Sequence, residues 1–197
     1  MTKTKSVQFK TGRGNALWPH LDRLYKWNDS ANKSMPHPDG DYDTKMVMSA
    51  KEAAPLVELI KQTIKETGIK PKFLPFSDEI DKETGEKTGN VVFTLKRYGK
   101  SQDGKLNKIG FFDAKGRMIQ RTIEITTGST IICSGWISVS AKSARLNLKN
   151  VQIIKLIERQ LDGFDAVEDE DAFVADEDAM DNEFVNEEEP DSGRPNF

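Results

Sequence analysis

The chain has 197 residues, of which 36% are hydrophobic and 31% charged, enough for one ordinary domain with a buried core. Its net charge of −3 is the sum of unequal parts, because residues 161–197 hold 15 acidic residues against a single Arg194 and carry −14, whereas residues 1–160 carry +11. We expect no membrane span and no secretory signal, and the lone Cys133 excludes an intrachain disulfide, as is usual in a reducing cytosol.

Residues 1–41 are expected to form an N-terminal extension. Glycine and proline interrupt this stretch repeatedly, which is typical of loops. Apolar side chains, Trp18 and Trp27 among them, are expected to anchor the extension on the domain that follows.

Residues 42–160 are predicted to form that domain. A strand is expected at Tyr42–Met48, followed by a helix over Ser49–Gly68. Ser49 and Glu52 fit a capping box and Gly68 can end the helix, although Pro55 conflicts with a regular first turn.

The rest of the domain has the pattern of strands. Alternating β-branched and aromatic residues with turn residues between them predict five segments, and the polar stretch Ser77–Asn90 is expected to be a loop. About five or six strands with one helix indicate a mainly β fold, an OB-fold-like small β-barrel, with an open sandwich as the competing architecture. The predicted segments are Val91–Tyr98, Lys108–Phe112, Arg117–Thr126, Thr130–Val139 and Arg145–Ile157.

Alternation along two of these strands gives candidate binding residues. In Thr130–Val139, Trp136 lies on a face of small polar residues, where a flat ring can stack on a nucleobase or be covered as part of a second core. In Val91–Tyr98, Lys96 and Tyr98 share the outer face, which suits either a phosphate and a base or a solvated edge.

Further cations follow in the turns and in the last strand. Any one of them can simply favour solubility, but their clustering favours a nucleic acid as ligand, with single-stranded and double-stranded DNA both left open. The apolar parity of the last strand changes near Asn150, which predicts a bulge. The remaining candidates for DNA binding are Phe111, Phe112, Lys100, Lys105, Lys108, Arg117, Arg121, Lys142, Arg145 and Lys149.

Catalytic motifs are weak. The sequence has no phosphate-binding Walker loop and no nucleophile elbow, so we predict no catalytic residues, no cofactor and no metal site. The alternation of Asp39, Asp41 and Asp43 leaves a metal-dependent nuclease as an unfavoured alternative.

Residues 161–197 are predicted to be a disordered acidic tail. Such a tail can be merely solubilising, or it can compete with DNA for a basic groove and recruit partner proteins. The candidate partner-binding residues are Phe173, Phe184, Phe197, Glu187, Glu188, Glu189 and Asp191.

The chain resembles the single-stranded DNA-binding proteins of tailed bacteriophages. The resemblance is carried by Ala16-Leu17-Trp18-Pro19, by the strand before the helix, and by Leu146–Ile154 ahead of an acidic tail ending in Phe. It implies an OB-fold and sequence-independent binding of single-stranded DNA in phage replication, recombination and repair, in the cytoplasm of the infected host.

The resemblance also implies tail contacts with the phage DNA polymerase and primase–helicase. We expect either a monomer or a homodimer. Two departures are the early position of the helix and a tail tip that carries Arg194 and Asn196 beside Phe197. A duplex-binding or strand-annealing accessory protein, and an adaptor that binds only protein, are the alternatives.

Overall fold

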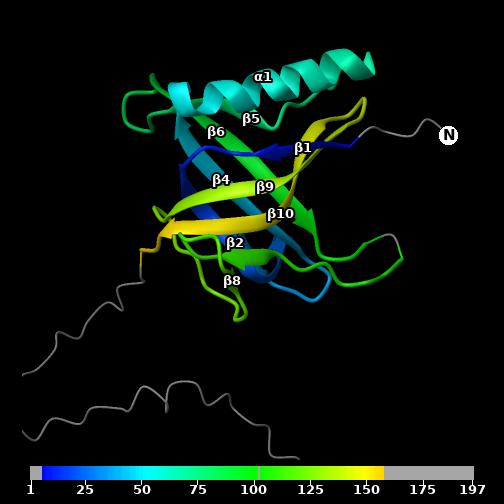
Figure 1. The fold of residues 1–197 in the computed structure, drawn as a ribbon, viewed down its shortest axis with the longest axis vertical. Coiled ribbons are helices and arrows are strands. Elements are labelled where there is room, and N and C mark those ends of the chain that lie inside the picture. Colours follow the sequence, from blue (N-terminus) through cyan, green and yellow to red (C-terminus); the bar gives the residue numbers. More distant parts are fainter. Residues whose placement is uncertain (1–5, 102, 158–197) are drawn as a thin grey trace, which may run out of the picture. The chain divides into compact units, whose positions relative to one another are not determined.

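The computed structural model describes residues 6–101 and 103–157, which form ten strands and one helix (Figure 1). The predicted tail, residues 161–197, lies outside the described residues, as does Gln102. The elements are β1 (Val7–Lys10), β2 (Gly14–Asn28), β3 (Lys33–Pro36), β4 (Asp41–Ser49), α1 (Ala50–Thr67), β5 (Phe76–Ile80), β6 (Lys87–Tyr98), β7 (Gly110–Phe112), β8 (Met118–Ile119), β9 (Thr130–Val139) and β10 (Ala144–Lys155).

Five of the strands pair in a ring. β2 pairs with β4, β4 with β6, and β6 runs parallel to β10, which in turn pairs with β9. A short contact between β9 and the start of β2 completes the ring, and β1, β3, β5, β7 and β8 extend it. The predicted mainly β, barrel-like fold with one helix is therefore confirmed.

The prediction of a loop-like N-terminal extension is wrong, because residues 14–28 form the barrel strand β2. Its register with β4 jumps from Leu17↔Lys45 to His20↔Asp43, so Trp18 and Pro19 form a bulge. Trp18 takes a positive φ of 46° at this bulge. The bulge interrupts the alternation by which a strand is identified in a sequence.

Two further boundaries differ from the prediction. The expected loop Ser77–Asn90 contains β5 and the start of β6, which form an exposed hairpin whose charged side chains face solvent. The expected strand Arg117–Thr126 is reduced to Met118–Ile119, although Ile125 is still buried in the core. Apolar residues can thus reach a core from an irregular segment.

The helix α1 agrees with its sequence signals. The Ser49 hydroxyl accepts a hydrogen bond from the Glu52 N–H, and Gly68 ends the helix in a left-handed conformation. The helix continues through Pro55 and buries Leu56 and Ile60 in the core. No helix in the described ranges is both long and apolar enough to cross a membrane.

The barrel core follows the predicted alternation. In β9, Ile131, Cys133 and Ile137 point inward and are buried, whereas Trp136 is on the opposite face. The register between β9 and β10 shifts between Leu148 and Asn150, which confirms the predicted bulge. This alternation leaves the polar and aromatic partners of the core strands on the outside of the barrel.

Candidate nucleic-acid interface

A groove runs over the outer face of β4 and β6. It consists of two hollows, of about 710 and 280 Å³, that share the lining residues Thr94 and Lys96. We call it the β4–β6 groove. Its lining also includes the side chains of Trp18, Trp27, Lys33, Lys45, Phe73, Tyr98 and Arg145.

Aromatic side chains are exposed along this groove, each close to a cation. Trp18 is 53% exposed, and the ammonium groups of Lys45 and Lys82 lie 5.3 and 5.5 Å from its ring centre. At the other end Tyr98 is 45% exposed between Lys96 and the Arg145 guanidinium, which donates to its hydroxyl. A ring available for stacking beside a cation is the combination that unpaired nucleotides require.

Carboxylates neutralise part of the charge beside this groove. Asp41 lies 2.9 Å from the Lys96 ammonium and also accepts the Gly99 N–H. Asp39 pairs with Lys100, whose hydrogen bond lowers the pKa of that carboxyl group. The ammonium groups of Lys96 and Lys100 therefore already have carboxylate partners before any ligand binds.

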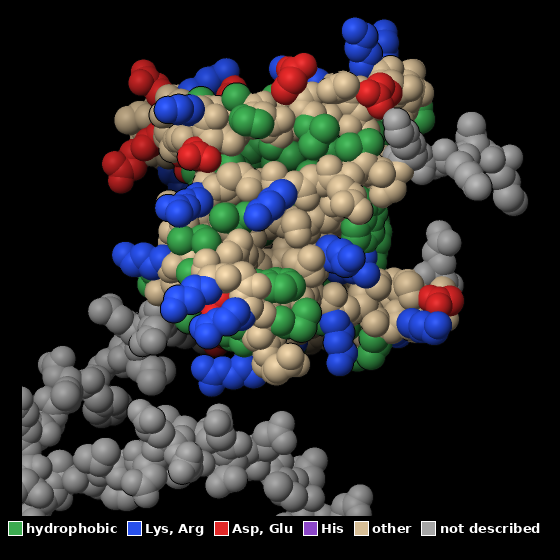
Figure 2. All heavy atoms as spheres, viewed as in Figure 1, with side chains coloured by type: hydrophobic (Ala, Val, Ile, Leu, Met, Phe, Trp, Pro, Cys, Tyr) green, Lys and Arg blue, Asp and Glu red, His purple; other side chains and the backbone are tan. Residues whose placement is uncertain are grey.

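A second groove lies on the outer face of β9 and β10. Its two hollows, of about 350 and 270 Å³, share Ser134 and Asn150, and we call it the β9–β10 groove. Figure 2 shows Lys and Arg side chains spread over this side of the barrel, whereas Asp and Glu lie mainly over α1 and the β5–β6 hairpin. The lining of the β9–β10 groove also includes the side chains of Gln8, Lys10, Arg97, Phe112, Trp136, Lys149 and Gln152.

Arg97 is the central cation of the β9–β10 groove. Its guanidinium lies 4.8 Å from the ring centre of Trp136, and its Nη2 donates to Asn107 at 2.6 Å. The Nε atom is buried without a hydrogen-bond partner. Burial lowers the pKa of this guanidinium, which shows that its charge is poorly solvated.

The chain superposes on gp2.5, a single-stranded DNA-binding protein encoded by bacteriophage T7, with a TM-score of 0.59 at 18% identity, over 87% of this chain and 100% of gp2.5. The single-stranded DNA-binding protein from bacteriophage Enc34, in complex with single-stranded DNA, matches with a TM-score of 0.52 at 17% identity, over 77% of this chain and 88% of that protein. The chain has the fold of phage single-stranded DNA-binding proteins.

The resemblance expected from the sequence is thus confirmed for the fold. A C-terminally truncated form of the Enc34 protein matches with a TM-score of 0.55 at 17% identity, over 77% of this chain and 87% of that one. No family model and no curated protein matches the sequence.

The candidate residues named from the sequence fall into three groups in this fold. Lys96, Tyr98 and Arg145 line the β4–β6 groove, with Lys142 in the adjoining β9–β10 turn. Trp136, Lys149 and Phe112 line the β9–β10 groove instead. Exposed cations outside the lining of both grooves are Lys100, Lys105, Lys108, Arg117 and Arg121, of which Lys100, Lys105 and Arg117 pair with Asp39, Asp103 and Asp113 respectively.

Phe111 is wrong as a stacking residue, because its side chain is buried in the core with 6% of its surface exposed. Its neighbour Phe112 faces outward. The sequence left the two open as alternatives, because a three-residue strand offers too few positions to fix its parity.

Sequence reasoning missed the aromatic residues of the β4–β6 groove. Trp18 and Trp27 were expected to anchor the N-terminal segment, but more than half of each side chain is exposed. Phe73, 54% exposed with Lys72 above its ring, was not singled out. The Trp18-Pro19 dipeptide within an apolar stretch was the available signal, since proline inside a strand favours a bulge.

The three aspartates that suggested a metal-dependent nuclease take separate partners. Asp39 pairs with Lys100, Asp41 with Lys96, and Asp43 accepts a hydrogen bond from His20 Nδ1 at 2.7 Å. Across residues 6–101 and 103–157, no group of three His, Cys, Asp or Glu side chains is arranged to hold a metal ion.

Proposed function

We propose that the chain binds single-stranded DNA without sequence preference, and that the β4–β6 groove is its main binding surface. The observation that carries this proposal is the row of exposed rings, Phe73, Tyr98, Trp18 and Trp27, beside lysine and arginine side chains. Every base has a face that stacks on an aromatic ring, so such a row tolerates any sequence. The shared fold with phage single-stranded DNA-binding proteins supports the same ligand.

The chemistry favours unpaired over paired strands. Stacking on Trp18 or Tyr98 requires a base whose faces are accessible, and duplex DNA offers only its phosphates and groove edges to these rings. Lysines around the rings would bind phosphates and release counterions. The role we propose is therefore binding, without catalysis.

The deciding experiment compares Trp18→Ala/Tyr98→Ala with Trp18→Phe/Tyr98→Phe in the full chain. Loss of both rings is expected to weaken binding of labelled oligo(dT) about a hundredfold, because each base stack contributes roughly 1–3 kcal/mol. The Phe pair keeps the rings and should bind within a fewfold of the parent. Fluorescence anisotropy gives the affinities, with circular dichroism as the folding control.

An unchanged affinity in the folded alanine variant would reject this surface. A parent protein that binds duplex DNA as tightly as oligo(dT) would favour the duplex-binding alternative, because stacking cannot then be the basis of affinity.

The biological setting we propose is phage DNA replication, recombination and repair in the cytoplasm of an infected bacterium. The acidic residues 161–197 would act as an intramolecular competitor of DNA, since a tethered polyanion has an effective concentration on the order of mM. Once DNA displaces the tail, its aromatic and acidic residues, ending at Phe197, would recruit the phage polymerase and primase–helicase.

Deleting residues 161–197 tests the competition. We expect tighter binding of oligo(dT), by about tenfold at low salt and less as salt screens the tail. Weaker binding by the truncated chain would overturn the competition. Pull-down of the polymerase by the full chain but not by a chain lacking Phe197 would support recruitment.

A further inference from the structure

The β9–β10 groove has cations that the protein leaves without carboxylate partners. Lys10, Arg97 and Lys149 line it, and among the described residues none of the three forms an ion pair. Within the same part of the chain, neither hollow is lined by Asp or Glu. The positive charge of this groove is therefore not compensated by nearby carboxylates, and it attracts anions.

Arg97 makes the attraction specific. The Arg97 guanidinium is half-buried, and its Nε–H has lost contact with water without gaining a protein acceptor. Part of its desolvation cost is therefore not offset by a hydrogen bond. The Nε atom itself is out of contact with solvent, so a phosphate in the hollow would bind the guanidinium through its other nitrogen atoms, by charge-assisted hydrogen bonds. The Lys149 side chain is exposed and lines the same hollow, so a second phosphate contact is available there.

The groove also has the means to hold bases. Trp136 and Phe112 lie in its two hollows, and the amides of Gln8, Asn150 and Gln152 offer both donors and acceptors. Aromatic rings with basic and amide side chains around them suit unpaired nucleotides of any sequence. A small inorganic anion would use only the cations.

The two grooves are separate surfaces. They share no lining residue, and alternation along β6 directs Lys96 and Tyr98 to one groove and Arg97 to the other. On β10, Arg145 lines the first groove and Lys149, farther along the same outward face, lines the second.

We infer that the β9–β10 groove is a second binding site for unpaired nucleotides, so that one chain holds two segments of single-stranded DNA. This inference rests on the proposed function of the β4–β6 groove. The two segments belong either to one strand that passes around the barrel or to two strands held side by side.

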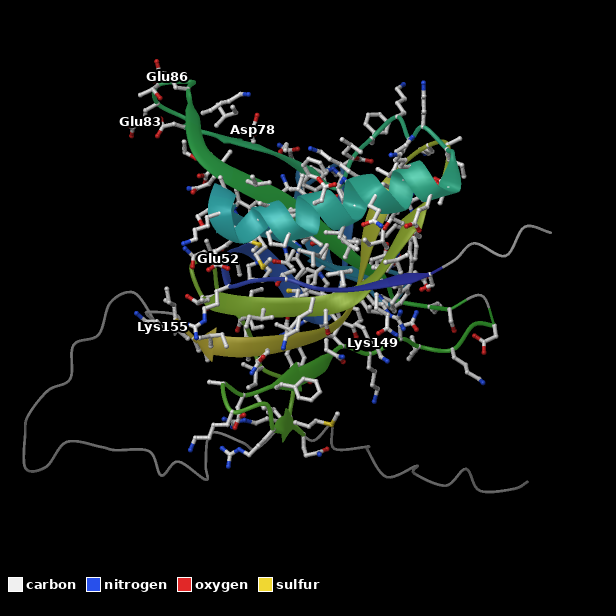
Figure 3. All side chains as sticks on the ribbon, turned by 45° about the horizontal axis from the view of Figure 1, so that its top comes forward. Glu52, Asp78, Glu83, Glu86, Lys149 and Lys155 are labelled. Carbon is white, nitrogen blue, oxygen red and sulfur yellow. The ribbon has the colours of Figure 1, made fainter. Side chains whose placement is uncertain are left out.

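The test uses the full chain and an oligo(dT) of about six nucleotides, within the range that one OB-fold covers. The variant Arg97→Gln/Lys149→Gln removes two charges from the groove. The matched control Lys155→Gln/Lys61→Gln removes two charges from outside both grooves, since Lys61 is exposed on α1 and Figure 3 shows that Lys155 is well separated from Lys149 along β10. Titration calorimetry should give two oligonucleotides per chain for the parent and control, and one for the variant.

Salt dependence gives an independent readout on an oligo(dT) of about 20 nucleotides. Loss of two phosphate contacts should reduce the slope of log K against log salt by about 1.4, since each contact to a single strand contributes about 0.7. The control should keep the parent slope. One long strand per chain indicates that it passes through both grooves, and two indicate that separate strands are held.

One short oligonucleotide per parent chain, with equal slopes for variant and control, would overturn this inference and leave the proposed function intact. No binding of oligo(dT) by the parent would overturn both. If Arg97→Gln prevents folding, Lys149→Gln alone still gives the slope, with an expected reduction of about 0.7.

Discussion

The two grooves differ in how their positive charges are balanced. At the β4–β6 groove, Asp41 holds Lys96 and Asp39 holds the nearby Lys100, while large rings are exposed to solvent. At the β9–β10 groove the cations have no carboxylate partners among the described residues, and Trp136 is partly covered by Arg97. The first surface should therefore bind mainly by stacking and the second mainly by charge.

This difference has a simple structural origin. Both grooves use side chains from β6 and β10, and the period of two along a strand sends neighbours to different surfaces. On β10, Arg145 and Lys149 both face outward, and they line different grooves because they lie at different points along the strand. One short stretch of sequence thus supplies two chemically unlike surfaces.

The largest expected effect comes from Gly135→Ala, which disturbs both grooves at once. A Cβ at position 135 would overlap the backbone carbonyl of Asn147 on β10, so the central strand pair must separate. We expect a loss of stability on the order of 3 kcal/mol, measured by urea unfolding. Ser134→Ala, at the neighbouring outward position, should cost less than about 1 kcal/mol.

Cys133 provides a second readout for the same variant. Burial raises the pKa of its thiol to about 12, so in the folded parent it is both inaccessible and protonated near neutral pH. A thiol reagent at pH 8 should label Gly135→Ala much faster than the parent. Equal labelling rates and equal urea midpoints would show that the strand pair tolerates the added methyl group.

The next largest effect separates stacking from charge. Trp18→Ala should weaken oligo(dT) binding about tenfold at every salt concentration, because stacking is not screened and its loss leaves the slope unchanged. Lys149→Gln should weaken binding only at low salt, with a smaller slope. Affinities measured from about 50 to 500 mM salt give a line of log K against log salt for each protein. The line for Trp18→Ala should run parallel to that of the parent, whereas the line for Lys149→Gln should converge on it. If the lines of both variants ran parallel to that of the parent, binding by stacking at the β4–β6 groove and by charge at the β9–β10 groove would be contradicted.

Regular alternation made part of this molecule predictable. Thr130–Val139 was predicted with the bounds of β9, and the caps of α1 were read from Ser49 and Gly68. These features depend on local sequence, where side-chain parity and capping hydrogen bonds determine the structure. The bulge in β10 was visible for the same reason, as a change of parity.

The missed features depend on which strands become neighbours. Trp18 lines the β4–β6 groove only because the bulge in β2 turns its ring outward beside Lys45 of β4. Alternation places Arg97 with the core residues Phe93 and Leu95, but at the end of β6 its side chain reaches Trp136 on β9. Neither contact follows from spacing along one strand, because both require the closed order of the sheet.

The smallest effect we predict concerns the carboxylates of the β4–β6 groove. Asp41→Asn removes the charge that holds Lys96 but keeps an oxygen that can accept the Gly99 N–H. Lys96 would then be free to bind phosphate, and we expect about threefold tighter binding of oligo(dT) at low salt, within the usual range for an exposed ion pair. The matched control is Asp78→Asn, which breaks a similar pair with Lys87, and neither residue lines either groove (Figure 3). Tighter binding by both variants would mean that net charge alone matters, whereas tighter binding by Asp41→Asn alone assigns the effect to Lys96.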